Sequence, residues 1–165
     1  PILLADTVIT LNPAGKEIRF GRAYLENSFG PETSTLGQVL SVEYFDGTNF
    51  VLANTDTCTQ YNSTNVSFGS LNEVSLDTDD IPLVSGSFVD VDDLSDGVTR
   101  QIILPAAGDG NQGKVDVIYD IYPWLEYDWD WDGVTVKEFN DNPSAVATFG
   151  LFRGNDRIIY QREVH

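Results

Sequence analysis

The sequence predicts an all-β protein, a single β-sandwich of about nine short antiparallel strands that is Ig-like or jelly-roll-like. Three observations lead to this fold class. Short runs rich in β-branched and aromatic residues recur between turn residues, several of these runs alternate apolar and polar residues, and no stretch shows the period of a helix. We therefore expect one domain over residues 1–165.

The expected strands follow one another with short connections. They cover residues 17–25, 38–45, 49–53, 65–71, 83–91, 98–104, 114–122, 145–152 and 157–164. Alternation is clearest in the runs 98–104 and 114–122, which is the pattern of a strand with one face in a core and one face in water. The connections are expected to be irregular, and the longer ones cover residues 29–36, 54–64, 92–97, 105–113 and 133–143.

Two turn sequences predict β-hairpins. Asp46 and Gly47 separate the β-favouring runs 42–45 and 50–52. Residues 154–156, a Gly-Asn-Asp sequence, separate the last two expected strands in the same way. Hairpins of this kind join neighbouring antiparallel strands and fit the predicted sandwich.

The chain is strongly acidic. Its 165 residues include 26 Asp and Glu against 9 Lys and Arg, which gives a net charge of -17. Nucleic-acid binding depends on basic side chains that neutralise phosphates, and an anionic membrane surface repels a chain of this charge. No run approaches the roughly 18 to 20 apolar residues of a membrane span. We therefore expect no nucleic-acid partner and no direct membrane insertion.

Residues that carry catalysis are scarce. The only histidine is His165 at the end of the chain, which leaves no His-based triad. We expect no enzyme activity, but a glycosidase with a pair of carboxylates stays an alternative, because the sequence does not show how far apart the acids lie. Cys58 is the single cysteine, and we expect a free thiol that is buried or half-buried.

The segment 127–133 begins like a calcium-binding loop. Asp128, Asp130 and Asp132 occur at every second residue and Gly133 follows them. Calcium takes about six to eight oxygen ligands, and loops that bind it place carboxylates at positions one, three and five and a glycine at position six. The spacing therefore predicts a calcium site at these three aspartates.

The later loop positions fit less well, because position twelve is Phe139 where a carboxylate would close the site. The closing ligand is therefore expected from Glu138 or Asp141. The alternative interpretation is a β-strand in which the aspartates face water while Trp129 and Trp131 face a core.

Aromatic residues gather around this loop. Tyr122, Trp124, Tyr127, Trp129 and Trp131 lie within about ten residues of one another. If exposed, the last three would stack on sugar rings and form the ligand-binding site of a carbohydrate-binding module. If buried, they would fill a core, since large aromatic side chains supply much of the buried area of a small domain.

Several blocks of the sequence resemble the C-terminal domain of MshQ-like proteins, which are large bacterial proteins linked to the mannose-sensitive haemagglutinin (MSHA) type IV pilus. The resemblance runs from about residue 20 to the end of the chain. The blocks are FGRAYLENSFGPE at 20–32, EYFDG at 43–47 with Phe50, DTCT at 56–59, WLEYDWD at 124–130, NPSA at 142–145 and ATFGLFRGNDRIIY at 147–160.

The resemblance implies the terminal module of a longer exported protein, at the cell surface or outside the cell. Its partners would be pilus components or a surface glycan, and its role adhesion or pilus assembly; the family domain has no established activity. The acidic loop also occurs in the family, usually with Gly at the position of Trp131. A disulfide from Cys58 would need a partner outside this chain. We expect a non-catalytic surface module with calcium as its cofactor.

Overall fold

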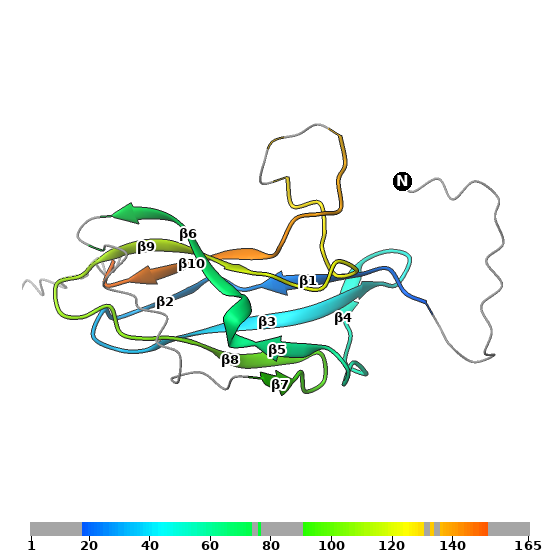
Figure 1. The fold of residues 1–165 in the computed structure, drawn as a ribbon, viewed down its shortest axis with the longest axis horizontal. Helices are drawn as coiled ribbons and strands as arrows, with labels where there is room; N and C mark the ends of the chain where they lie inside the picture. Colours follow the sequence, from blue (N-terminus) through cyan, green and yellow to red (C-terminus); the bar gives the residue numbers. More distant parts are fainter. Residues whose placement is uncertain (1–17, 74–75, 77–90, 131–132, 134–135, 152–165) are drawn as a thin grey trace, which may run out of the picture.

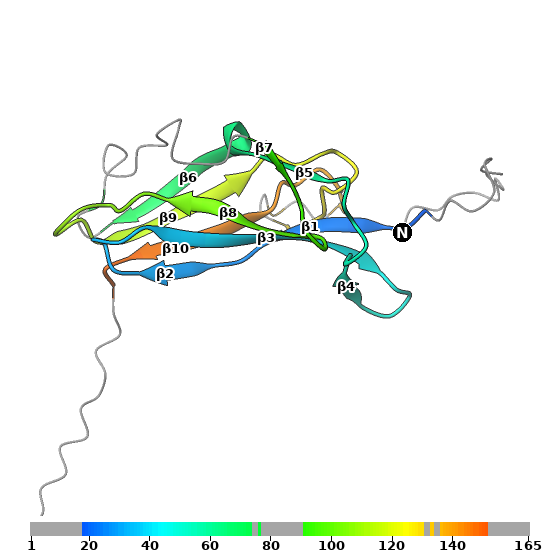
Figure 2. The ribbon, with the colours of Figure 1, turned by 90° about the horizontal axis from the view of Figure 1, so that it is seen from below.

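The computed structural model describes residues 18–73, 76, 91–130, 133 and 136–151, in which the chain forms ten β-strands and one short 3-10 helix. These elements are β1 (Gly21–Leu25), β2 (Ser28–Gly30), β3 (Leu36–Phe45), β4 (Phe50–Leu52), β5 (Gln60–Asn62), η1 (Ser63–Asn65), β6 (Val66–Glu73), β7 (Val91–Asp93), β8 (Val98–Leu104), β9 (Gly113–Tyr119) and β10 (Ser144–Phe149). Figures 1 and 2 show two facing layers of strands that run along the long axis of the molecule. The predicted all-β, sandwich-like class is confirmed.

The first layer is the sheet β1-β3-β4, in which β8 also pairs with β3. β1 lies on one edge of β3, with Leu25 opposite Leu40. On the other edge, β8 pairs with the first part of β3 and β4 with its last three residues, so these two strands follow each other along β3. The long strand β3 is therefore the centre of this sheet.

The second layer is the sheet β2-β10-β9-β6, and its β2–β10 pair is parallel. β1 in the first sheet continues into β2 in the second without reversing, so β2 keeps the direction of β1 (Figure 1). At the crossing, Oδ1 of Asn27 accepts a hydrogen bond of 2.7 Å from the backbone N–H of Val146. The other strand pairs in the described residues are antiparallel, as expected.

A short ribbon of β5 and β7 connects the two layers on the other side. β5 leads through η1 into β6 of the second sheet, and β7 leads into β8 of the first. Tyr61 of β5 is fully buried and its ring stacks on that of Tyr119, with centroids 5.7 Å apart. Burial raises the pKa of both phenols. The ribbon therefore closes one side of the core.

The core lies between the two main sheets and consists of their inward-facing side chains. The first sheet contributes Ala23, Leu25, Leu36, Leu40, Val42, Ile102 and Leu104, and the second contributes Val66, Val115, Val117, Tyr119, Ala145, Ala147 and Phe149. Burying one large apolar side chain of this kind stabilises the fold by about 1.5–3 kcal/mol. The alternate residues of these strands face outward, and some of them form the surfaces described below.

The predicted elements agree with the structure where alternation runs over several residues or where a turn sequence separates two strands. The strand at 98–104 has the predicted bounds, and the hairpin at Asp46 is confirmed as the β3–β4 connection. There Oδ1 of Asp46 accepts hydrogen bonds from the backbone N–H groups of Thr48 and Asn49, both at 2.8 Å, and Gly47 takes a φ of 104°.

Three short strands were not predicted. β2, β5 and β7 lie at least partly in stretches expected to be irregular, and each has three residues, too few to show alternation. The strand predicted at 157–164, the hairpin at 154–156 and most of the strand at 83–91 lie outside the described residues. Within the described ranges, no helix has the length and apolar character needed to cross a membrane.

Candidate functional site

Residues 120–143 connect β9 to β10, and their described part is joined at Leu125 to the edge of β1 that faces away from β3. The backbone N–H of Ala23 donates to the carbonyl of Leu125 at 2.8 Å, and the side chain of Leu125 is buried. Further along, Tyr127 and Asp141 pair through two backbone hydrogen bonds of 3.1 Å each. Figure 1 shows the yellow and orange parts of this segment leaving the sheets near β1. We call it the β9–β10 segment.

Arg22 of β1 is the centre of the contacts that hold this segment. Its guanidinium carbon lies 3.9 Å from the ring centroid of Phe50, 5.1 Å from that of Tyr127 and 4.9 Å from that of Trp129. Nη2 of Arg22 lies 2.7 Å from Oε2 of Glu43, and Nε donates to the same oxygen. Each cation–π contact contributes about 0.5–2 kcal/mol. One side chain thus joins β1, β3, β4 and the β9–β10 segment.

Aromatic rings surround Arg22 on the outer side of the first sheet. Neighbouring rings have centroids 5.1–6.2 Å apart, in tilted or edge-on arrangements. The rings are those of Phe20, Tyr24, Phe45, Phe50, Tyr127, Trp129 and Phe139, and with Arg22 we call them the Arg22 cluster. These rings form a second, smaller apolar centre outside the sandwich core.

The predicted calcium loop is irregular backbone. Asp130 has a φ of 57° and Gly133 a φ of 69°, both in the left-handed region. The backbone N–H of Gly133 donates to the carbonyl of Asp130 at 3.4 Å. A left-handed residue interrupts an extended chain, so the alternative interpretation of this segment as an alternating strand is wrong for the residues that the structure describes. Asp128 is half-buried and Asp130 is exposed.

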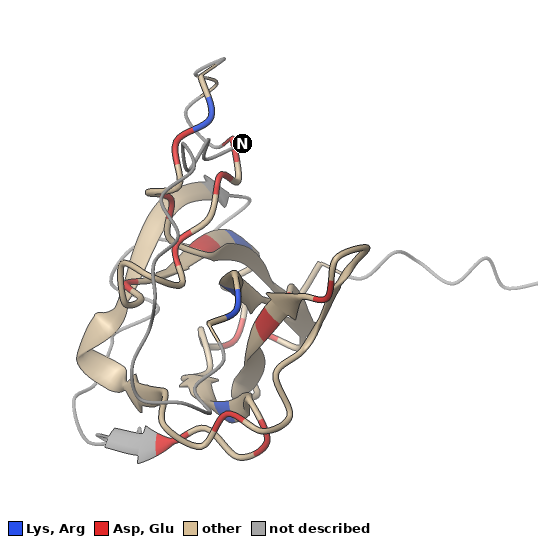
Figure 3. Cartoon of the chain, turned by 90° about the vertical axis from the view of Figure 1, so that its right-hand side faces the viewer, with Lys and Arg blue, Asp and Glu red and all other residues tan. Residues whose placement is uncertain are grey.

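The expected calcium ligands that the structure describes are not gathered around one point. Oδ2 of Asp141 accepts a hydrogen bond of 2.9 Å from the backbone N–H of Trp129, and Oε2 of Glu138 accepts one of 3.3 Å from Asn140. Among the described residues, no three His, Cys, Asp or Glu side chains lie close enough to hold a metal ion. Figure 3 shows acidic residues spread over strands and loops. Asp132 lies outside the described residues, so the calcium site stays a prediction.

The aromatic residues predicted to bind a ligand have different positions. Tyr127 and Trp129 are half-buried in the Arg22 cluster, and Trp131 lies outside the described residues. Trp124 and Phe29 are much more exposed, at 69% and 82% of their surface. Phe29 was not predicted as a ligand residue, because it lies in a stretch that looked irregular. Its place beside Thr148 on β10 depends on the parallel strand pair.

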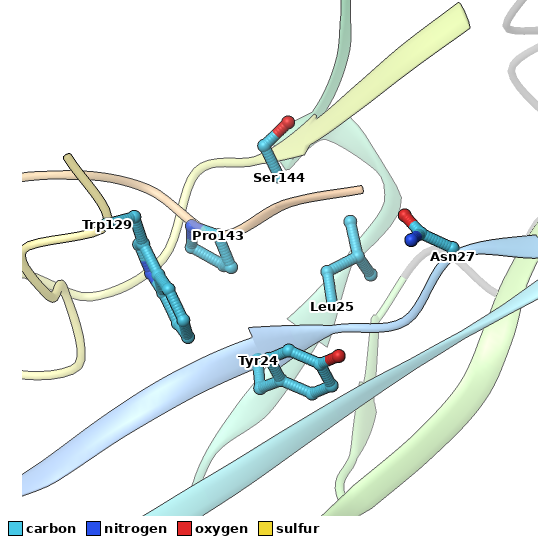
Figure 4. A pocket seen from close by; sticks show the side chains of 6 residues that line it. All are labelled: Tyr24, Leu25, Asn27, Trp129, Pro143 and Ser144. Carbon is cyan, nitrogen blue, oxygen red and sulfur yellow. The ribbon is translucent and has the colours of Figure 1, made fainter. Parts of the chain in front are cut away.

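A small cavity lies where the Arg22 cluster meets the crossing from β1 to β2. Its volume is about 140 Å³. Figure 4 shows Trp129 and Asn27 at opposite ends of it, with Leu25 and Pro143 between them. Tyr24 and Ser144 complete the lining. The walls are mostly apolar, with polar groups at the rim, which is the composition of a binding pocket.

Two larger depressions adjoin this cavity on the outer face of the second sheet. The first, of about 510 Å³, shares Asn27 with the cavity, and the second, of about 380 Å³, shares Ser144 with it. The two depressions also share Ser70 and Asp116 with each other. The cavity and the two depressions therefore form one continuous surface, which we call the sheet-face groove.

A separate depression of about 350 Å³ contains two carboxylates, those of Glu43 and Asp56. Glu43 is paired with Arg22. Burial, which raises the pKa of Asp56, is outweighed by hydrogen bonds from the Thr59 hydroxyl and from two backbone N–H groups, so this pKa lies below its usual value.

Cys58 is exposed, contrary to expectation, because it lies in the turn held by Asp56 and has no inward position.

Replacing Arg22 tests its role in fastening the segment. We expect Arg22→Ala to lower the free energy of unfolding by about 2–3 kcal/mol, because the stacking and the ion pair are lost together. Arg22→Lys should recover only part of this loss, since an ammonium lacks the planar face. Urea unfolding measures the difference. Arg100→Ala, at an exposed position of β8, is the control and should change stability by less than about 0.5 kcal/mol. Equal free energies of unfolding for Arg22→Ala and Arg100→Ala would refute the role of Arg22 in holding the segment.

The calcium prediction is tested by thermal unfolding of metal-free protein. A bound ion stabilises the folded state by mass action, about 2.7 kcal/mol at a hundredfold excess over Kd. Millimolar calcium should raise the Tm and a chelator should reverse the rise. Asp130→Asn should abolish the response, while Asp109→Asn, at an exposed residue outside the loop, should keep it. A Tm that does not change with calcium removes the metal site.

Comparison with known proteins places the chain in a family. A family model described as DUF6701, fourth domain, matches residues 19–164. This range agrees with the extent of the resemblance found in the sequence. No curated protein and no solved structure gives a match. Because the family model covers most of the chain, the chain belongs to the family of DUF6701 fourth domains.

Proposed function

We propose that this chain is a non-catalytic recognition module of an MshQ-like, MSHA pilus-associated surface protein, where it acts in adhesion or pilus assembly. The pilus association is supported by the sequence blocks at 20–32, 124–130 and 147–160. The family membership is consistent with it. The partner would be a pilus component or a glycan at the cell surface.

The observation that carries the proposal is the sheet-face groove. Its lining residues come from the crossing between β1 and β2, from the β9–β10 segment and from the strands of the second sheet. Side chains on paired strands hold their positions better than side chains on loops, and a site built on them is preorganised for a ligand. A broad and open groove of this kind suits an extended partner.

Recognition is favoured over catalysis because two of the carboxylates near depressions have partners within the protein and only one carboxylate lines the groove. Glu43 pairs with Arg22, and Asp56 is held by its own turn. Asp116 is the one carboxylate among the described residues that line the sheet-face groove. Glycoside hydrolysis needs two carboxyl groups facing each other across the substrate, typically about 5 to 10 Å apart.

The predicted calcium site would support the same function. Trp129 lines the cavity at one end of the groove and lies next to Asp128 and Asp130 in the chain. An ion bound by these aspartates would restrict the loop that carries Trp129. The cavity would then keep its shape without a ligand, which reduces the entropic cost of binding.

The proposal is tested by measuring binding of the chain to purified MSHA pilins and to a glycan array. The blocking variant is Val146→Arg, which places a long charged side chain at a half-buried, outward position of β10 inside the groove. The control is Ile103→Arg, at an outward position of β8 that is 38% exposed. Both positions are apolar and lie on the outer face of a sheet.

We expect the wild-type chain and the Ile103 variant to bind a pilin or a glycan, and the Val146 variant to bind neither. Circular dichroism and unfolding curves establish that both variants fold. The proposal is wrong if the wild-type chain binds nothing in either panel. It is also wrong if Val146→Arg leaves the binding unchanged.

A further inference from the structure

The outer face of the second sheet carries side chains in regular rows across its strands. Phe29 of β2 lies beside Thr148 of β10, which lies beside Lys114 of β9. In the next row, Val146 of β10 lies beside Asp116 of β9. These alternate residues face away from the core, because the residues between them are buried. The rows therefore form a surface that crosses the strands.

The edge strand β6 keeps this surface open. A register shift between Phe68 and Leu71 leaves Gly69 and Ser70 next to Asp116. A Cβ atom at Gly69 would lie 3.2 Å from Cδ1 of Ile118 and 3.3 Å from Cβ of Asp116, closer than side chains usually pack. The glycine thus allows β6 to lie close to β9 without covering the carboxylate.

Most of the lining consists of small polar groups. Hydroxyl groups come from Ser70, Ser144 and Thr148, and an amide comes from Asn27. Asp116 adds a carboxylate that accepts hydrogen bonds only. Within the described part of the chain, the side chain of Asp116 makes no hydrogen bond or ion pair. The groove can therefore pair with many hydroxyl groups, both as donor and as acceptor.

Apolar surfaces lie at both ends of this polar lining. Phe29 is 82% exposed at one rim and presents an almost complete ring face. At the other end, the cavity beside Tyr24 and Trp129 has a volume of about 140 Å³. Cavities of about 150 Å³ hold one six-membered ring. Each end can accept one ring or one ring substituent.

This combination matches the chemistry of a sugar chain. A pyranose ring has an apolar C–H face that packs on an aromatic ring and a rim of hydroxyl groups that needs donors and acceptors. The backbone groups of β9 and β10 are used in the strand ladder, so the face offers a peptide strand no backbone pairing.

Charge decides which sugar chain fits. The net charge of -17 repels polyanions, and Lys114 is the only basic residue among the described residues that line the groove. Resting on the recognition function proposed above, we infer that the sheet-face groove binds a neutral oligosaccharide. The oligosaccharide lies over β10 and β9, with one ring on Phe29 and a terminal ring or substituent at the Tyr24–Trp129 cavity.

The test is calorimetric titration of the chain with neutral hexasaccharides, namely the hexamers of cellulose, amylose, mannan and chitin, and with a hexagalacturonate as the anionic counterpart. At least one neutral hexamer is expected to bind, and the anionic hexamer is not. Phe29→Ala should raise the Kd about fivefold, the effect of losing one aromatic contact. Asp116→Ala should raise it more than about tenfold through the loss of charged hydrogen bonds.

Matched controls lie outside the groove. Trp124→Ala removes an aromatic ring that is 69% exposed, and Asp109→Ala removes an exposed carboxylate. Both should keep the wild-type Kd. Wild-type affinity in the Phe29 and Asp116 variants would overturn the assignment of the groove, as would tighter binding of the anionic hexamer.

The outcomes separate this inference from the proposed function. If no neutral hexamer binds at millimolar concentration while pilin binding remains, the glycan inference falls and the recognition function stands. If neither the hexamers, the glycan array nor the pilins bind, both fall together.

Discussion

The guanidinium of Arg22 is the constraint on which the outer part of this structure depends. It lies against one aromatic ring of β4 and two of the β9–β10 segment, and is neutralised by Glu43 on the neighbouring strand. A cation in an aromatic environment needs such a partner, because an unpaired charge away from water is costly. The cluster fixes the β9–β10 segment against β1, and this position places Trp129 at the cavity. The shape of the candidate site therefore depends on Arg22, which does not itself line the sheet-face groove.

The acidic and aromatic residues divide into two groups with different roles. Tyr127 and Asp141 hold the β9–β10 segment through ring contacts and backbone pairing. The side chains of Phe29 and Asp116 make no ring contact, hydrogen bond or ion pair in the described part of the chain, and they line the sheet-face groove. The strands of the second sheet keep these residues in register. Tyr24 and Trp129 belong to both groups, because they lie in the Arg22 cluster and also line the cavity.

The sequence predicted the parts of the fold that depend on local patterns. The strand at 98–104 and the hairpin at Asp46 were found because alternation and turn chemistry are properties of neighbouring residues. β2 was missed because three residues carry no period, and its parallel pairing depends on the crossing at Asn27. That crossing is a property of the whole sandwich.

The candidate site was only partly predictable for the same reason. The sequence pattern singled out the segment with Asp128 and Trp129, but its backbone turns at Asp130, which spacing alone does not reveal. Arg22 gave no signal, since its aromatic partners are distant in the sequence. Phe29 and Asp116 meet on one face only through the order of strands β2, β10 and β9. Residues brought together by strand order leave no trace in local composition.

Amide hydrogen exchange of the native chain tests most directly whether the β9–β10 segment belongs to the folded unit. The informative N–H groups are that of Ala23, which donates to Leu125 and joins β1 to the segment, and those of Tyr127, Trp129 and Asp141, which donate hydrogen bonds within the segment. The account predicts that these groups exchange slowly, like those of β1, and that Arg22→Ala removes their protection together. Fast exchange at Tyr127, Trp129 and Asp141 in the wild-type chain would contradict it.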